Sequence, residues 1–306
     1  MITLRPVETD DDLLQWIGVR RIVFPDEPAA TMEQMRALEA PDRLLLLAER
    51  DGELAGSGLA TRSDTGDGFV APRVLPEHSR RGVGTALLAP LLEHVRAHGF
   101  EAAVAHADDE AALAFARTHG FVEVDREVGQ VREVSPNEPA AAPYEGVAFA
   151  SIEERPELLE RAFSVAEQGY ADLALASGSM RVTIEEWLRD EATLPGGSLV
   201  ALDGEQVVGY AGLLSWNDDD TRAENGLTAV DREWRRRGLA TALKRRQIAW
   251  AAANGIRELI TWTQTGNEGM RTVNEALGYV TRTISLRMRR ELGPGDGLRA
   301  RASPTP

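Results

Sequence analysis

The chain has 306 residues, of which 43% are hydrophobic, and its formal net charge at pH 7 is −15. This length and composition suit two ordinary domains with filled cores, and the absence of cysteine excludes disulfides, thiolate nucleophiles and cysteine-ligated metals. The acidic surface disfavours nucleic acid and anionic membranes as partners. No apolar run approaches the ~20 residues of a membrane span, and the first residues do not resemble a signal peptide. We therefore expect a cytoplasmic protein.

The first half of the chain predicts a set of strands followed by a strand–helix–strand–helix–strand series. Asp51-Gly52-Glu53, and Asp203-Gly204-Glu205 in the second half, are typical of hairpin turns. This order indicates a mixed sheet with helices on its faces, which is an α/β (α+β mixed-sheet) fold. The predicted strands are 2–4, 43–50, 53–61, 69–74, 102–105 and 121–134, and the predicted helices are 10–20, 32–39, 85–97 and 110–118.

A proline- and alanine-rich stretch at 136–143 predicts an extended linker, and the same order of elements then recurs. Thr183 is a suitable N-cap for the helix that follows it. The tail at 293–306 is rich in glycine, proline and arginine, which predicts disorder. The second series comprises helices at 156–168, 184–190, 239–254 and 268–277 and strands at 199–202, 206–215, 224–230, 257–263 and 280–289.

An internal repeat explains this recurrence. The segment 79–87 is similar to 235–243, which lies 156 residues later. Each copy leads into a helix that we expect to end at a glycine, Gly99 or Gly255. So long a spacing indicates duplicated domains. We predict an N-terminal domain at 1–135, a linker at 136–144, a C-terminal domain at 145–292 and a tail at 293–306.

A basic, glycine-containing turn separates a strand from a helix in each copy. Backbone N–H groups at a helix N-terminus lack partners and carry the positive end of the helix dipole. A glycine there lets an anion such as phosphate approach the backbone. This feature alone is a weak signal, because many such turns only connect two elements.

The turn of the second copy resembles the Arg/Gln-x-x-Gly-x-Gly/Ala motif with which GNAT-superfamily acyltransferases hold the pyrophosphate of acetyl-CoA. Arg235, Gly238 and Ala240 fill its first, fourth and sixth positions. The similarity extends to Asn267 and to the run that ends at Gly278-Tyr279. The resemblance therefore implies two tandem GNAT domains, with a mycothiol synthase-like architecture.

The resemblance also implies where the coenzyme lies. The strands at 224–230 and 257–263 should separate, with the acyl-pantetheine between them and a backbone amide near Val230 polarising the thioester carbonyl. The coenzyme-binding residues implied in this way are Thr228, Ala229, Val230, Arg235, Arg236, Arg237, Gly238, Leu239, Ala240, Thr241, Asn267, Met270 and Asn274.

The chemistry requires a proton acceptor, because a lysine-like amine has a pKa of ~10.4 and is protonated at pH 7. Glu224 occupies the place of a glutamate base that many family members carry, although a solvated loop acid is an equally good interpretation. Asn274 stands where members commonly have a tyrosine. An amide could bond the coenzyme sulfur but is a poor acid, so the proton donor is left open. The acidic residues at 218–220 would favour a cationic substrate.

The first copy departs further from the family pattern. Ser79 replaces the leading Arg/Gln, Gly68 stands in the place of Glu224, and Ala116 in that of Asn274. We interpret this copy as degenerate. A second, weaker coenzyme site would comprise Val74, Arg80, Arg81, Gly82, Val83, Gly84 and Thr85. The five histidines match no usual ligand spacing, so we expect no metal site.

These observations favour an acetyl-CoA-dependent N-acetyltransferase that acts on the primary amine of a small molecule by direct attack in a ternary complex. Two other interpretations stay open. The chain could be a non-catalytic acyl-CoA-binding or sensing protein, or a mycothiol synthase-type amino-sugar acetyltransferase. The sequence leaves the acceptor, the acyl-chain length and the choice between monomer and homodimer undetermined.

Overall fold

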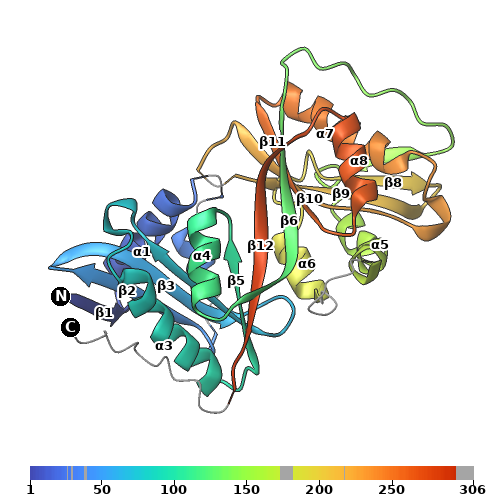
Figure 1. Cartoon of the computed structure of the whole chain (residues 1–306). Helices are drawn as coiled ribbons and strands as arrows, with labels where there is room; N and C mark the ends of the chain where they lie inside the picture. Colours follow the sequence, from blue (N-terminus) through green and yellow to red (C-terminus); the bar gives the residue numbers. More distant parts are fainter. Residues whose placement is uncertain (26, 29, 38–39, 173–181, 217, 294–306) are drawn as a thin grey trace. The chain divides into compact units, whose positions relative to one another are not determined.

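The structure is a computed structural model that describes residues 1–293 except 26, 29, 38–39, 173–181 and 217 (Figure 1). The end of the helix predicted at 32–39 and nearly all of the predicted tail, 294–306, lie outside the described residues. The chain forms two compact units. Among the described residues, unit 1 contains Met1–Val124 and the residues 287–293, and unit 2 lies within Asp125–Leu286.

In the described residues, both copies of the repeat have the same order of elements. The first copy comprises β1 (Ile2–Pro6), α1 (Asp10–Val23), α2 (Met32–Ala37), β2 (Leu44–Arg50), β3 (Glu53–Arg62), β4 (Gly68–Val74), a 3₁₀ turn η1 (Pro76–His78), α3 (Val83–Ala97), β5 (Ala102–Ala107), α4 (Glu110–Thr118) and β6 (Val122–Glu133). The second comprises β7 (Ala148–Ser151), α5 (Leu158–Asp172), α6 (Ile184–Asp190), β8 (Leu199–Asp203), β9 (Gln206–Ser215), β10 (Arg222–Val230), η2 (Arg232–Trp234), α7 (Leu239–Ala253), β11 (Glu258–Gln264), α8 (Glu268–Ala276) and β12 (Val280–Glu291).

The strand order shows that the two copies exchange their closing strands. In unit 1 the order is β1-β2-β3-β4-β5-β12, and in unit 2 it is β7-β8-β9-β10-β11-β6. Strand β6 pairs antiparallel with β11 along the whole of Glu258–Gln264. The predicted α/β mixed-sheet fold is confirmed. The division at 1–135 and 145–292 follows the sequence repeat and stays a prediction, since the compact units cut through β6 and β12.

Each sheet has a parallel pair at its centre. Strand β4 pairs parallel with β5, and β10 pairs parallel with β11, whereas β1–β2, β2–β3, β3–β4, β7–β8, β8–β9 and β9–β10 pair antiparallel. The predicted hairpins at residues 51–53 and 203–205 are confirmed by the β2–β3 and β8–β9 pairings.

Helices cover both faces of the sheet in unit 2. The side chains of successive residues of a strand point to opposite faces, and β9 shows this alternation. Tyr210 packs with Trp187 of α6, their ring centroids being 4.9 Å apart, in the cluster that includes α5. Its neighbour Ala211 packs with Leu239 and Leu243 of α7. Any residue of β10 therefore faces either α5 and α6 or α7.

Three predicted helix ends are confirmed. Thr183 caps α6 by accepting a hydrogen bond from the backbone N–H of Glu186. Gly99 and Gly255, beyond the ends of α3 and α7, both have φ of +80°. This left-handed conformation ends a helix at little cost only when the residue is glycine. The predicted helix at 85–97 begins two residues earlier than expected, at Val83.

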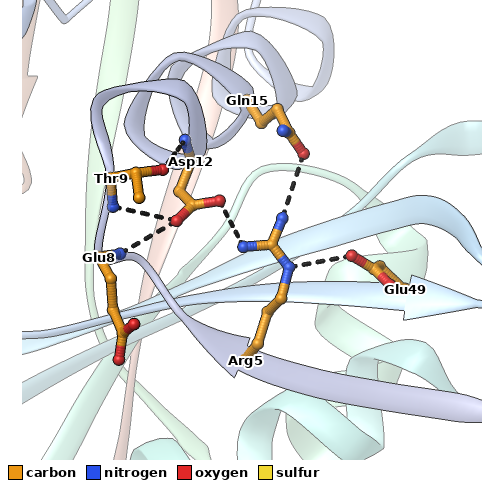
Figure 2. A network of polar contacts seen from close by, with 6 residues as sticks. All are labelled: Arg5, Glu8, Thr9, Asp12, Gln15 and Glu49. Atoms are coloured by element: carbon orange, nitrogen blue, oxygen red, sulfur yellow. Dashed lines mark hydrogen bonds and ion pairs between the residues drawn. The ribbon is translucent and has the colours of Figure 1, made fainter.

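A polar network ties the first helix of unit 1 to its sheet (Figure 2). Thr9 and Asp12 form a capping box at the start of α1. Arg5 of β1 pairs with Asp12 and, at 2.9 Å, with Glu49 of β2. The hydrogen bond from Arg5 holds the pKa of Asp12 well below its ordinary value. The helix start is therefore fixed against two strands at once.

Strand β12 is fastened to unit 1 by a buried arginine. The guanidinium of Arg287 donates to Asp64 at 2.7 Å and to Thr65 at 2.7 Å, both in the β3–β4 turn. Only 6% of the Arg287 side chain is exposed. A buried cation that loses its carboxylate partner is left with an uncompensated desolvation penalty.

We therefore expect Asp64→Ala to lower the free energy of unfolding of unit 1 by about 1–2 kcal/mol. The matched control is Glu291→Ala, which removes the well-exposed partner of Arg289 in the same strand and should cost less than about 0.5 kcal/mol. Denaturant unfolding of the two variants measures the difference. Equal losses would contradict the role given to Arg287.

Candidate functional site

The basic turn has the same unusual backbone in both units. Arg236 and Gly238 have φ of +62° and +80°, and Arg80 and Gly82 have φ of +61° and +85°. Within the described residues, no side chain caps the first turn of α7 or of α3. The N–H groups at each helix start are therefore available to an anion. The duplicated sequence has thus preserved an anion-binding geometry twice.

The arginines of the second turn have different surroundings. The guanidinium of Arg235 is held by other protein groups. Its Nε donates to the carbonyl of Val230 at 2.9 Å, and its Nη1 pairs with Asp172 at 2.6 Å. Arg237 stacks on Trp234. Arg236 is exposed. Arg236 is therefore the arginine of this turn with the freest access to a bound anion.

Strands β10 and β11 separate as expected. They pair only over Arg222–Asn225 and Glu258–Thr261, although β10 continues to Val230. In addition, the β9–β10 register shifts between Asn225 and Thr228, which is a β-bulge. In the described part of unit 2, the backbone of residues 226–230 therefore has no strand partner on the side of β11.

Buried polar atoms without partners gather along these strands. Asn274 is fully buried, and its Nδ2 donates to Gln130 of β6 at 3.0 Å and to Thr263 of β11 at 3.4 Å. The Asn274 Oδ1, the Gln130 Nε2 and the Oγ1 of Thr228 find no partner among the described residues. Buried polar atoms are normally hydrogen-bonded, so a ligand with amide groups would fit here.

A polar network fills the α7 side of β10. Tyr279 donates to Asn225 at 2.5 Å, and Asn225 donates to Gln247 of α7 at 3.0 Å. Lys244 is fully buried, with its Nζ 5.1 Å from the centre of the Tyr279 ring, and no carboxylate in the described chain pairs with it. Burial lowers the pKa of Lys244 to about 7.

Unit 1 has apolar residues at the corresponding positions of its repeat. Its turn and helix are intact, but the side chains at these five positions are hydrocarbon. In the order Asn225, Lys244, Gln247, Asn274 and Tyr279, the first copy has Phe69, Leu88, Leu91, Ala116 and Phe121. The polar network around Lys244 is therefore a property of the second copy.

A carboxylate reaches the bulge of β10 from the opposite face. Glu191 follows the end of α6 and accepts a hydrogen bond from the hydroxyl of Tyr210 at 3.1 Å. Burial raises the pKa of Glu191 to about 7, against the opposing effect of hydrogen bonds from Tyr210 and from the backbone N–H of Leu227. Glu191 thus contacts the strand where its pairing with β11 has ended.

The structure brings some predicted site residues together. Glu224 lies in β10, opposite Leu214, and is partly buried. Asn267 caps α8 by accepting from the Met270 N–H at 3.4 Å, and Asn274 lies inside the fold between α8 and β11. Whether these residues act on a coenzyme or substrate stays a prediction.

Two ionisable residues at the site escaped the sequence analysis. Glu191 lies in an acidic stretch that resembles any solvated helix end. Lys244 stands in the basic run 244–246, in which its neighbour Arg245 is exposed. A comparison of the two copies would have found Lys244, since the first copy has Leu88 there.

The raised pKa of Glu191 makes a prediction about stability. A carboxyl whose folded pKa is about 7 and whose ordinary value is 4.5 binds more protons in the folded state between these values. Its contribution to stability is therefore lost as the pH rises. We expect Glu191→Gln to gain about 3 kcal/mol relative to wild type between pH 4 and pH 8. Urea unfolding at both pH values measures this gain, and an unchanged difference would contradict it.

Lys244 should show the opposite trend. Its folded pKa is about 7, against an ordinary value of 10.5, so the penalty for burying the ammonium is largest below pH 7 and fades as the pH rises towards 10. We expect Lys244→Met to stabilise the free protein by up to about 5 kcal/mol at pH 6.5 and by much less at pH 10. Urea unfolding of Lys244→Met and wild type tests this, and a pH-independent difference would refute it.

No helix in the described residues is long and apolar enough to cross a membrane. The described residues also contain no group of three His, Cys, Asp or Glu side chains that could hold a metal ion.

Some known proteins are similar to this chain in sequence, and others are similar to it in fold. The mycothiol acetyltransferase of Actinosynnema mirum is 30% identical over 249 residues, which cover 76% of this chain and 79% of that protein. A GCN5-related N-acetyltransferase from Sphaerobacter thermophilus superposes with a TM-score of 0.75 at 22% identity, covering 97% of this chain and 98% of that one. A tandem GNAT protein from the clavulanic acid biosynthesis pathway gives a TM-score of 0.75 at 20% identity, covering 97% and 100%.

The model of the acetyltransferase (GNAT) family matches twice, at residues 11–121 and 157–279. These ranges cover most of both copies of the repeat. The chain therefore belongs to the GNAT acetyltransferase family, as an N-acetyltransferase with two tandem GNAT domains.

Proposed function

We propose that unit 2 transfers the acetyl group of acetyl-CoA to the primary amine of a small molecule. The observation that carries this proposal is the early end of the β10–β11 pairing next to the uncapped start of α7. The first feature leaves strand backbone available to the coenzyme's amide-bearing arm, and the second provides N–H groups for its pyrophosphate. Acetyl-CoA would supply the acyl thioester that the amine attacks.

The residues present fit this coenzyme. Its phosphates would meet the backbone of 237–241 and the side chain of Arg236. Its amide groups would meet the strand edge at 228–230 and the unpartnered oxygens of Thr228 and Asn274. On the sequence alone, proton transfer is assigned to Glu224 and a place near the sulfur to Asn274, and both roles stay predictions.

Unit 1 keeps the turn, but the helix that follows it has close neighbours. A ring carbon of Phe115 would lie 3.2 Å from a Cβ placed on Gly84, so α4 packs tightly against the start of α3. The hydroxyl of Thr85 forms a hydrogen bond with Nε2 of His119 at 3.3 Å. We infer that unit 2 is the principal coenzyme site, and that the second site around Arg80 and Gly82 is weak.

The acceptor is a separate question. The relative from Actinosynnema mirum is named for mycothiol, which favours amines of amino-sugar conjugates as the first compounds to test. A coenzyme sensor is the alternative function. Binding of acetyl-CoA without consumption in the presence of amino-sugar, aliphatic and cationic amines would favour the sensor over the transferase.

Arg236→Glu should weaken acetyl-CoA binding at least tenfold, because it places a negative charge beside the pyrophosphate. This corresponds to a loss of about 1.4 kcal/mol or more. The matched control is Arg80→Glu, at the same backbone conformation in unit 1, which should leave the principal Kd unchanged. Titration calorimetry with acetyl-CoA measures both. An equal effect of the two substitutions would contradict the assignment to unit 2.

A further inference from the structure

The bulge of β10 is built to receive a side chain from outside the sheet. Gly212 of β9 faces the bulged residues, and a Cβ placed on it would lie 2.5 Å from Oε2 of Glu191. A Cβ on Gly226 would lie 3.2 Å from the same oxygen. Two glycines on neighbouring strands therefore leave the space that the carboxylate of Glu191 occupies.

Unit 1 has filled this space. Ala60 stands eight residues after the hairpin Gly52, as Gly212 stands eight after Gly204, and Val70 occupies the place of Gly226 relative to the basic turn. Ala60 and Val70 are fully buried and pair in a regular β3–β4 register. In the described residues, the bulge at this place and its two glycines thus occur in the second copy alone.

Several titratable groups face Glu191. The hydroxyl of Tyr210 donates to it from β9, and the charge of Glu191 acts on Tyr170 of α5. Asp190 is its neighbour at the end of α6, and repulsion from Asp190 disfavours ionisation of Glu191. Glu224 lies on the same face of β10, because it stands opposite Leu214, whose side chain would be 3.4 Å from a Cβ on Gly226.

We propose that Glu191, rather than Glu224, takes the proton from the attacking amine. The inference rests on the proposed function of unit 2. Glu191 is hydrogen-bonded to the backbone of the bulge itself, and β10 has left β11 at this point. A thioester held between the two strands would therefore come within reach of this carboxylate.

The proton and electron balance is simple. The ionised carboxylate of Glu191 removes one proton from the ammonium group of the acceptor, which leaves a neutral amine. The amine nitrogen forms a bond to the carbonyl carbon, the carbon–sulfur bond breaks, and its electron pair leaves on the sulfur. The second amine proton neutralises that thiolate. The products are the amide, the free thiol and a protonated Glu191, which returns its proton to solvent.

The environment suits this role at neutral pH. Burial holds the pKa of Glu191 near 7, where a general base combines a sufficient ionised fraction with adequate basicity. Activity should therefore fall on the acidic side of about pH 7. The hydrogen bond from Tyr210 lowers the pKa of Glu191, so its removal should move this fall to higher pH.

The test compares Glu191→Gln, Tyr210→Phe and Glu224→Gln with wild type in the full chain. Acetyl-CoA affinity is measured by calorimetry, and kcat/KM by thiol release from pH 5.5 to 9 with the best amine found. We expect Glu191→Gln to bind acetyl-CoA within threefold of wild type and to lose at least a hundredfold in kcat/KM. Its remaining activity should also lose the fall below about pH 7, which is the acidic limb of the pH profile. Tyr210→Phe should keep activity with the limb shifted to higher pH, and Glu224→Gln should keep the limb near pH 7.

Two results would overturn the inference. If Glu191→Gln keeps the rate and limb of wild type while Glu224→Gln loses both, Glu224 is the base and Glu191 is structural. If Tyr210→Phe leaves the limb in place, Glu191 does not set it, and this holds even if Glu191→Gln fails to fold. If the wild-type protein binds acetyl-CoA but consumes it in the presence of none of the amines, the proposed function is overturned, and this inference with it.

Discussion

The candidate site depends on the early end of one strand pairing. Strands β10 and β11 are held together by only four residues of each, after which β10 bulges and continues alone. Strand backbone without a partner is costly to bury, so the arrangement is stable only if something else meets those amides. The unpartnered oxygens of Thr228 and Asn274 lie along the same strands. Hydrogen bonds between β10 and β11 are thus missing at the place where a ligand could form them instead.

The two units show which parts of such a site depend on the backbone and which on side chains. The turn recurs with the same left-handed residues, because its glycine and the following helix require that conformation. The interior has diverged. Unit 2 buries Lys244 and a hydrogen-bonded set of amides, whereas unit 1 has leucine, phenylalanine and alanine at these places. Burying polar groups has an energetic cost, and unit 1 avoids that cost at these positions, although it buries Arg73 elsewhere in its core.

The sequence predicted features that repeat locally. The order of elements, the hairpins, the cap at Thr183 and the glycine ends of α3 and α7 all follow from short-range patterns, and they are confirmed. Contacts between distant segments could not be predicted. Glu191 reaches the bulge only because Gly212 and Gly226, on different strands, leave space together. The exchange of β6 and β12 was missed for a related reason: a closing strand has the same pattern whichever sheet it joins.

That exchange has a consequence for how the protein is made. The strand that follows β5 in the strand order, β12, is translated only after almost the whole second copy. Domains usually fold as units while the chain leaves the ribosome, but here unit 1 must wait with β5 exposed, and an uncovered edge invites pairing with other chains. Each copy is thus the other's folding partner. Selection for correct assembly would preserve the degenerate half even if it never touched a substrate.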